Sequence, residues 1–425
     1  MKQKFLDELK MKSKKISAFL FANLISVALL FSEIDLKSMA DSDLVALQEQ
    51  IKIELAERKK AKSILAQKEL ETSEKIVIPE EYLIFKANED FTEVTIVGIR
   101  IDDGEKRVNF EKSIKDKIVQ IPSEIQGIPV TKLEPKYEIR GNSDVPEGVV
   151  QNITNWRPHD YNRATIYIHI KNLYIPDGIK ITPYCFAGTS VDYVRLPEDL
   201  EEIPGNCFEN SMLKGITVPS SVKKIGEYAF YNCGHISRDN LGYIEYEQAD
   251  FEINFNEGLE EIGDAAFAQN KIKTLEFPES LRKIKVAAFS VKTIEKVIFN
   301  EGLEYIGGGC FYYDDRNEGI EGARFINYDL VLPKNLVYLG SYAFKNTGIK
   351  SVSFPKNLKA AGQEAFYDCN NLESLEFEED FAPYIDGDSL ADVCKGEKIE
   401  KNLLLQKKLK SVKCNRENKK FMIKE

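Results

Sequence analysis

Apolar and polar positions recur in one pattern along most of the chain. In one unit, Ile216-Thr217-Val218-Pro219 alternates apolar and polar residues, which predicts a short strand with one buried face. Proline ends this strand because it has no N–H to donate to a β-ladder. Val222 and Ile225 follow as inward positions, Gly226 allows a tight bend, and Phe230 closes the unit.

The closing aromatic residue repeats every 22 residues, with insertions that add 15 and 11 residues to two of the intervals. A unit this short cannot bury its apolar side chains alone, so neighbouring units must stack into a continuous core. The pattern therefore predicts an α/β solenoid with a parallel sheet on one face. The predicted core phenylalanines are Phe186, Phe208, Phe230, Phe267, Phe289, Phe311, Phe344 and Phe366.

The cysteines follow the same period. Cys185, Cys207 and Cys310 each precede a repeat phenylalanine, where other units have alanine, and Cys233 and Cys369 each stand three residues after one. None of the seven cysteines lies closer than 20 residues to the next, which excludes the usual zinc spacings. The odd count also disfavours a disulfide framework. We interpret these residues as small buried packing groups.

The N-terminal part differs in character. Ile16 to Phe31 is a run of 16 uncharged residues that follows Lys12, Lys14 and Lys15. A basic segment before a short apolar run is typical of a secretory signal. At ~1.5 Å per residue the run spans about 24 Å as a helix, less than the roughly 30 Å hydrocarbon core. Residues 1–40 are therefore predicted to be a signal peptide, with a signal anchor as the alternative.

Composition and the 22-residue period predict the boundaries between the remaining segments of the chain. Residues 41–75 lack Gly and Pro, and their apolar residues Leu44, Leu47, Ile51 and Leu55 fall at helical spacing. This segment is predicted to be a helical stalk, linker or oligomerisation helix before the array. The predicted boundaries then assign 76–135 to the start of the array, 136–166 to an insertion and 167–414 to the solenoid. The basic tail, 415–425, either helps to cap the last unit or contacts an anionic surface.

The repeat units resemble a known family. They read IPSSVKKIGEYAFYNCGHI and FPKNLKAAGQEAFYDCNNLESLEF, and upstream lie FTEVTIVGIR and IVQIPSEIQGIPVTKL. These segments are similar to BspA-type leucine-rich repeats of bacterial surface proteins, over roughly residues 91–377 and on toward Cys414. The resemblance implies an exported, non-enzymatic interaction protein, because several members of that family act as adhesins toward host matrix proteins or other cells.

Candidate contact residues come from the outward strand positions and from the insertions. Tyr174, Tyr193 and Arg195 form the densest outward group, and Tyr and Arg are favoured in protein interfaces. The insertions add Trp156, Tyr243 and Tyr246 on loops of a rigid scaffold. A plain solvated sheet face, with insertions packed back as lids, is the alternative at both places.

Charge and motifs narrow the function. Lys and Arg number 58 and Asp and Glu 69, a net charge of −11, which disfavours nucleic-acid binding. No GxSxG, P-loop, HExxH or GxGxxG motif occurs, so no enzyme, cofactor or metal is predicted. A Ser–His–Asp site would have to use one of only three histidines, His159, His169 and His235. We expect an exported surface adhesin or recognition module with a protein partner, touching membrane only through an uncleaved N-terminal segment. The alternative is a scaffold in the cell envelope or cytoplasm.

Overall fold

The computed structural model describes residues 71–99, 104–134, 169–236, 247–291, 294–312 and 329–362, and shorter stretches at 364–367, 369, 371–372, 374–377, 411–414 and 420–421. The chain separates into two compact units, Met1–Glu71 and Thr72–Glu425, and every element named below belongs to the second. The predicted signal segment, and the predicted stalk helix as far as residue 70, lie outside the described residues.

Each repeat forms one coil that contains a longer strand and a two-residue strand. In the coil that starts with β11 (Gly215–Val218), the chain turns after Pro219, forms β12 (Lys224–Ile225) and turns again around Phe230. The side chains of Val218, Ile225 and Phe230 are fully buried. The apolar positions that the sequence pattern predicts as inward are inward in the structure, so the 22-residue repeat is a structural unit.

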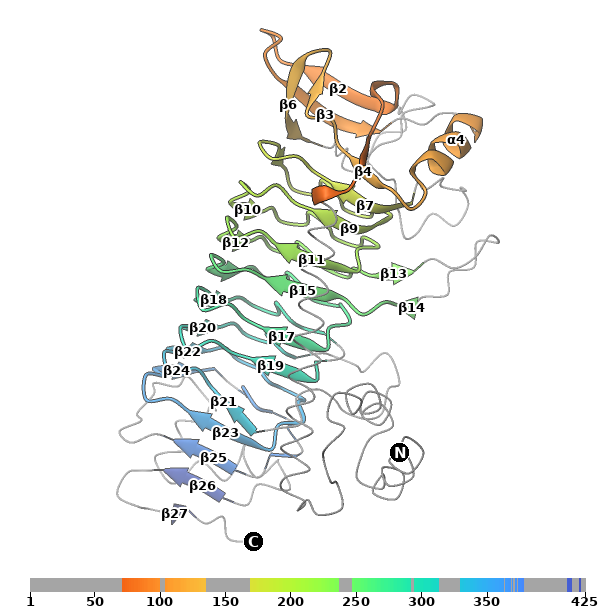
Figure 1. Cartoon of the computed structure of the whole chain (residues 1–425). Helices are drawn as coiled ribbons and strands as arrows, with labels where there is room; N and C mark the ends of the chain where they lie inside the picture. The colour runs from red at the N-terminus through yellow and green to blue at the C-terminus, as the bar shows by residue number, and fades with distance from the viewer. Residues whose placement is uncertain are drawn as a thin grey trace, which may run out of the picture. The chain divides into compact units, whose positions relative to one another are not determined.

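The longer strands lie side by side, in chain order and parallel, and together form what we call the strand face (Figure 1). They form parallel ladders in the groups β1-β4-β7-β9, β11-β15, β17-β19 and β21-β23-β25-β26, with β27 (Lys420–Phe421) antiparallel at the end. The remaining members are β1 (Lys75–Val77), β4 (Ile118–Gln120), β7 (Ile170–Tyr174), β9 (Val191–Arg195), β15 (Glu252–Phe255), β17 (Thr274–Glu276), β19 (Lys296–Ile298), β21 (Asp329–Val331), β23 (Ser351–Phe354), β25 (Ser374–Phe377) and β26 (Ser411–Cys414).

The two-residue strands form a second parallel sheet, which is continuous over seven coils. Its second position is a buried column that begins Ile203, Ile225, Ile262, Ile284, Ile306. Each coil thus covers the apolar edge of the one before it, which confirms the predicted solenoid. The strands are β10 (Glu202–Ile203), β12, β16 (Glu261–Ile262), β18 (Lys283–Ile284), β20 (Tyr305–Ile306), β22 (Tyr338–Leu339) and β24 (Ala360–Ala361).

All eight predicted phenylalanines are buried, and their rings stack from coil to coil. The ring centroids of Phe208 and Phe230 lie 5.3 Å apart with an interplanar angle of 2°. The residue two positions before each phenylalanine has a positive φ, for example Asn206 at 56°. The turn is nevertheless satisfied, since the N–H of Phe208 donates to the carbonyl oxygen of Ala229 in the next coil at 2.7 Å.

The five described cysteine side chains are buried and carry free thiols. Burial disfavours the thiolate and raises the pKa of Cys233 to about 12, and it raises the pKa values of Cys185, Cys207 and Cys310 as well. These thiols therefore serve as packing groups, as the repeat positions predict.

A non-repeating segment precedes the regular coils. It consists of a 3-10 turn (Glu80–Tyr82) and the elements β2 (Leu83–Ala87), β3 (Val94–Ile99), α4 (Gly104–Ile114), β5 (Glu124–Ile125) and β6 (Ile128–Leu133). β3 pairs antiparallel with β2 and parallel with β6, and β6 pairs parallel with β8 (Lys180–Ile181). The segment is thereby continuous with the coils through hydrogen-bonded strands.

The start of the strand face differs from the sequence-based expectation. The resemblance makes residues 91–100 the first strand of the array, but β1 pairs with β4 and begins the strand face, while β3 lies in a separate sheet. Helix α4 was not predicted either. Its buried residues Phe110 and Ile114 lie four positions apart, and the ring of Phe110 packs at 4.8 Å from that of Tyr82.

The insertions are described in part. The one after Cys233 opens and closes with an antiparallel pair, β13 (His235–Ile236) and β14 (Glu247–Gln248). Of the predicted contact residues on insertions, Trp156, Tyr243 and Tyr246 lie outside the described residues.

Candidate binding surface

The strand register puts alternate residues of neighbouring coils in line on the strand face. Asn172 is paired with Tyr193, and Tyr174 with Arg195, across β7 and β9. Further along the strand face, Thr274 is paired with Lys296 in the same register. Because outward residues of successive coils stand in line, contact residues from several repeats share one surface.

Tyr174 is held between two cations. Lys75 Nζ lies 4.4 Å from the ring centroid of Tyr174, and the guanidinium carbon of Arg195 lies 4.7 Å from it. Cations at these distances are attracted to the electron-rich face of the ring. The ring is therefore clamped on the strand face and is only partly exposed.

Arg195 is not an exposed contact residue, which corrects the sequence-based expectation. Only 4% of its side chain is exposed, and its Nη1 donates hydrogen bonds to the carbonyl oxygen of Ile175 at 3.1 Å and to Asp177 Oδ1 at 2.6 Å. The guanidinium in turn lowers the pKa of Asp177. The side chain thus positions Tyr174 and a turn of the coil, and it leaves the tyrosines as the outward groups.

Tyr193 is the most accessible aromatic residue of the described strand face, with 41% of its surface exposed. Partial burial raises its pKa, and the nearby carboxylates of Glu252 and Asp192 add to the effect. The phenol consequently remains protonated and able to donate a hydrogen bond at neutral pH. The next strand places Gly215 in the same outward row, so no side chain follows Tyr193 there.

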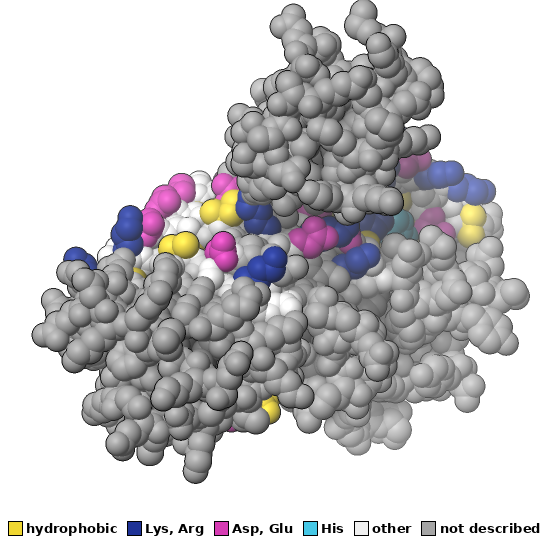
Figure 2. All heavy atoms as spheres, turned by 90° about the horizontal axis from the view of Figure 1, so that it is seen from below, with side chains coloured by type: hydrophobic (Ala, Val, Ile, Leu, Met, Phe, Trp, Pro, Cys, Tyr) yellow, Lys and Arg dark blue, Asp and Glu magenta, His cyan; other side chains and the backbone are white. Residues whose placement is uncertain are grey.

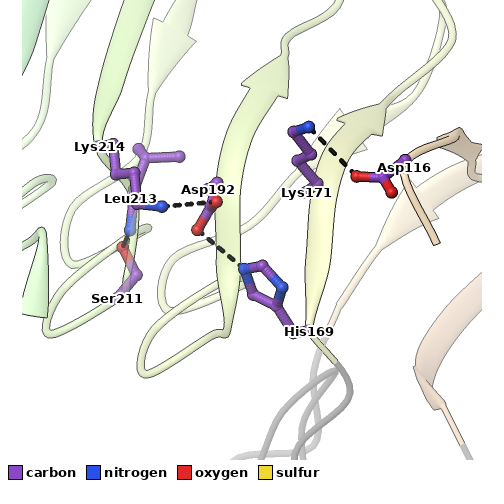
Figure 3. A network of polar contacts seen from close by, with 7 residues as sticks. All are labelled: Asp116, His169, Lys171, Asp192, Ser211, Leu213 and Lys214. Atoms are coloured by element: carbon purple, nitrogen blue, oxygen red, sulfur yellow. Dashed lines mark hydrogen bonds and ion pairs between the residues drawn. The ribbon is translucent and has the colours of Figure 1, made fainter. Parts of the chain in front are cut away.

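A polar network lies at the start of the same strands (Figure 3). Asp192, with 7% of its side chain exposed, lies between two more exposed groups: its Oδ1 is 2.9 Å from His169 Nε2, and its Oδ2 accepts a hydrogen bond from Lys214 Nζ at 2.7 Å. Burial by itself raises the pKa of Asp192, but the bonds to His169 and Lys214 outweigh it and lower the pKa. The carboxylate is therefore ionised and anchored.

The backbone reinforces this arrangement. The N–H of Lys214 donates to the carbonyl oxygen of Asp192 at 2.9 Å, which joins β9 to the following coil. In the preceding coil, Lys171 pairs with Asp116 at 3.3 Å. The side chains around Tyr193 thus belong to a braced, hydrogen-bonded edge, and the surface is preorganised.

Among the described residues, the side chain of His169 is bonded to the Asp192 carboxylate and not to a nucleophilic hydroxyl or thiol. A nucleophilic triad needs a hydroxyl or thiol within reach of the histidine. Ser211 is buried, and its hydroxyl oxygen accepts a hydrogen bond from the N–H of Leu213 at 3.4 Å (Figure 3). The hydroxyl also donates to Cys233 Sγ at 3.4 Å, so Ser211 packs into the coil. Of the other histidines in the chain, His159 lies outside the described residues.

Within the described ranges, no cluster of three or more metal-ligating side chains occurs. No helix of these ranges has both the length and the apolar character needed to cross a bilayer. Figure 2 shows acidic and basic side chains interspersed over the described part of the surface in that view. In that view, the described side chains form no patch of a single sign of charge.

Lys75 belongs to this surface, although the sequence pattern placed it in the predicted stalk. A signal for it was present: Ile76-Val77-Ile78-Pro79 has the same pattern as Val119-Gln120-Ile121-Pro122. The structure aligns these two segments as β1 and β4, with Lys75 opposite Ile118.

Comparison with known proteins supports this architecture. The family described as BspA type leucine-rich repeat region matches in six copies, over residues 164–249, 247–327 and 314–402. No curated protein matches the chain.

Three solved structures are similar over most of the chain. A leucine-rich repeat protein from Bacteroides ovatus is 17% identical, with 71% of this chain and 70% of that chain covered and a TM-score of 0.42. The pneumococcal vaccine antigen PcpA is 17% identical, with 70% and 69% covered and a TM-score of 0.38. A leucine-rich cell surface protein from Faecalibacterium prausnitzii is 13% identical, with 72% and 96% covered and a TM-score of 0.27.

The family match spans more than half of the chain, and its repeats coincide with the coils, the stacked phenylalanines and the two parallel sheets. This protein belongs to the BspA-type leucine-rich repeat family.

Proposed function

We propose that this chain is a non-enzymatic, exported recognition protein that binds another protein through the strand face around Tyr193, most specifically as a surface adhesin. Repeat solenoids of this kind expose an extended surface whose side chains come from many coils, and this architecture suits protein recognition. Family membership supports an interaction role in general, and the exposed strand face supports a particular place for it.

The observation that carries the proposal is the exposure of Tyr193 on a braced sheet. Tyrosine combines a large apolar ring with a hydrogen-bonding hydroxyl and loses little conformational entropy on binding, so it is enriched in interface hot spots. Neighbouring Tyr174 is already clamped by Lys75 and Arg195, so this part of the surface pays little ordering cost on association.

The rim around Tyr193 suits a protein partner. His169 and Lys171 lie on the β7 side of Tyr193, and Lys214 and the carboxylate of Glu252 lie on the β11–β15 side. Such a mixed polar rim fits a partner with an apolar pocket and scattered charges of both signs. The net charge of −11 argues against a polyanionic partner such as nucleic acid.

Export is the second part of the proposal, and the basic, then apolar, N-terminal segment supports it. We place the mature protein at the cell surface, in the periplasm or in the medium. Mass spectrometry of surface-shaved, secreted and cytoplasmic fractions tests this. A new N-terminus near residues 32–41, on peptides released from intact cells, is the expected result. An intact N-terminus confined to the cytoplasm would instead leave a scaffold.

Binding is tested with immobilised fibronectin, fibrinogen, laminin and collagen as probes, by surface plasmon resonance of the full chain. We expect saturable binding to at least one of them, weakened at least tenfold in Tyr193→Ala. Thr274→Ala is the matched control, because Thr274 is exposed in the same outward row on β17. Equal binding by both variants would show that Tyr193 is not part of the binding site. Absence of binding to every probe would contradict the assignment as an adhesin.

A further inference from the structure

A second exposed aromatic residue stands apart from the strand face, at the tip of the β2–β3 hairpin. Phe91 has 70% of its surface exposed, more than any other large apolar residue of the described ranges. It lies in the loop between Ala87 and Val94, which precedes the regular coils. Phenylalanine has no hydroxyl that water could hydrate. Its exposed ring therefore adds apolar surface in contact with water and does not stabilise the unbound protein.

The backbone at Phe91 is in a conformation that phenylalanine rarely adopts. Its φ is 54°, in the left-handed region that glycine and asparagine tolerate and bulky residues avoid. The N–H of Phe91 donates to the carbonyl oxygen of Asn88 at 3.1 Å, so Phe91 ends a tight turn in the place where hairpin loops favour glycine. At Phe91 this conformation comes without burial of the ring, so neither the backbone nor the side chain gains stability from a phenylalanine at this position.

The loop is rigid because Asn88 fastens it. Asn88 Oδ1 accepts hydrogen bonds from the N–H groups of Thr92 at 2.8 Å and Glu93 at 3.0 Å, and its Nδ2 donates to Thr92 Oγ1 at 2.9 Å. The backbone N–H of Asn88 also donates to the carbonyl oxygen of Glu93 at 3.0 Å. The backbone of the loop is therefore held in one conformation, which lowers the entropy lost when the loop binds a partner.

The charges around the ring indicate the partner. The loop contains three carboxylates, Glu89, Asp90 and Glu93, and no lysine or arginine. Lys86 on β2 and Lys132 on β6 both pair with Glu134, at 3.0 and 2.7 Å. A complementary partner offers an apolar pocket with a basic rim, whereas a second copy of this acidic chain or an anionic membrane would be repelled.

We propose that the Phe91 hairpin tip is a second protein-docking element, which inserts its ring into an apolar pocket rimmed by lysine or arginine on a partner protein. This contact is separate from the Tyr193 surface and does not rest on it. The strained conformation makes a sharp test available, because Phe91→Gly relieves backbone strain while it removes the anchor.

The experiment places the photo-crosslinking residue p-benzoylphenylalanine at position 91 of the full chain in intact producing cells. The control carries it at Tyr228, which is also exposed, aromatic and at positive φ, but lies on a coil turn. We expect a protein adduct at position 91 that is absent at 228. The captured protein is then purified and its affinity measured for the wild type, for Phe91→Gly and for the double variant Glu89→Lys, Asp90→Lys.

The proposal expects at least tenfold weaker binding by Phe91→Gly with an unchanged or higher Tm, and weaker binding by the charge-reversed variant and at higher salt. Tyr193→Ala should leave the adduct at position 91 intact, which separates this contact from the strand-face site. Three results would each overturn the proposal. The first is no adduct at position 91 above that of the Tyr228 control, and the second is an adduct to lipid or to a second copy of the chain. The third is an affinity of Phe91→Gly for the captured protein equal to that of the wild type.

Discussion

Replacing Phe267 with alanine tests the central claim that stacked coils, and no single coil, hold the fold. The side chain of Phe267 is fully buried. Its ring stacks on Phe230 at 5.0 Å and on Phe289 at 5.3 Å, and meets Phe255 edge-on at 5.8 Å. The substitution therefore removes contacts to the coils on both sides as well as within one coil.

The expected loss follows from these contacts. Truncating a buried phenylalanine to alanine costs roughly 3–5 kcal/mol, including the cavity left behind. The two stacked ring pairs alone contribute about 1–3 kcal/mol of this, at roughly 0.5–1.5 kcal/mol per pair beyond burial. Phe267→Ala should therefore fall near the upper end, at about 4–5 kcal/mol. Phe186 is equally buried but has one stacked ring among the described residues, Phe208 at 5.1 Å, so Phe186→Ala should cost about 3 kcal/mol.

Urea unfolding of the full chain, followed by far-ultraviolet circular dichroism, measures both losses. Phe91→Ala is the exposed control and should change stability by less than about 0.5 kcal/mol. If Phe267→Ala were no more destabilised than this control, the aromatic stack would not hold the coils together. If Phe186→Ala lost more than Phe267→Ala, the stability would not follow the number of coil interfaces.

Three further outcomes are expected. Gly226→Ala should lose about 1–3 kcal/mol in the same assay, because the new Cβ would lie 2.4 Å from the backbone nitrogen of Gly205 in the preceding coil. Asp192→Asn should lower the free energy of unfolding by about 1–3 kcal/mol at pH 7 and by less at pH 3. The pKa of Asp192 is lowered in the folded chain, so the ionised carboxylate stabilises the fold above the ordinary pKa near 4. This stabilisation is lost as the pH falls through the lowered pKa. Cys233 should stay unmodified by a thiol reagent at pH 8 until urea unfolds the chain, because burial raises its pKa to about 12; peptide mapping measures this. The contribution of the buried thiol to stability should decline as the pH rises above about 8.5, the pKa of an exposed cysteine, which unfolding curves at increasing pH measure.

The repeat is the part of this protein that sequence alone predicts well. Each coil is held by local alternation and by the same apolar positions in its neighbours, so the period places Phe208, Phe230 and their equivalents in the core without knowledge of any other contact. Combined with the alternation along each strand, the same period puts Asn172 in line with Tyr193 and Tyr174 in line with Arg195, and the structure has this register. These two rows of the strand face therefore follow from a period of two within each strand and a period of 22 between coils.

The candidate surface was only partly predictable. Position in the row made Arg195 an outward residue, but its burial depends on Asp177 and on the carbonyl oxygen of Ile175, which only the coil turn brings to it. The contact on one side of the Tyr174 ring comes from Lys75, which lies about a hundred positions earlier in the chain. Lys75 precedes the regular 22-residue repeats, so the period does not place it beside Tyr174. The exposure and strain of Phe91 likewise depend on how the hairpin turns around Asn88.

The sequence by itself determined the family, the solenoid and its buried columns, because these rest on repeated short-range patterns that every coil satisfies in the same way. Only the tertiary structure decided which outward side chains are free to meet a partner. Exposure at one position depends on side chains that approach from other coils and from the non-repeating N-terminal segment, and those approaches follow no period. Tyr193 and Phe91 are accessible for that reason, and Arg195 is not.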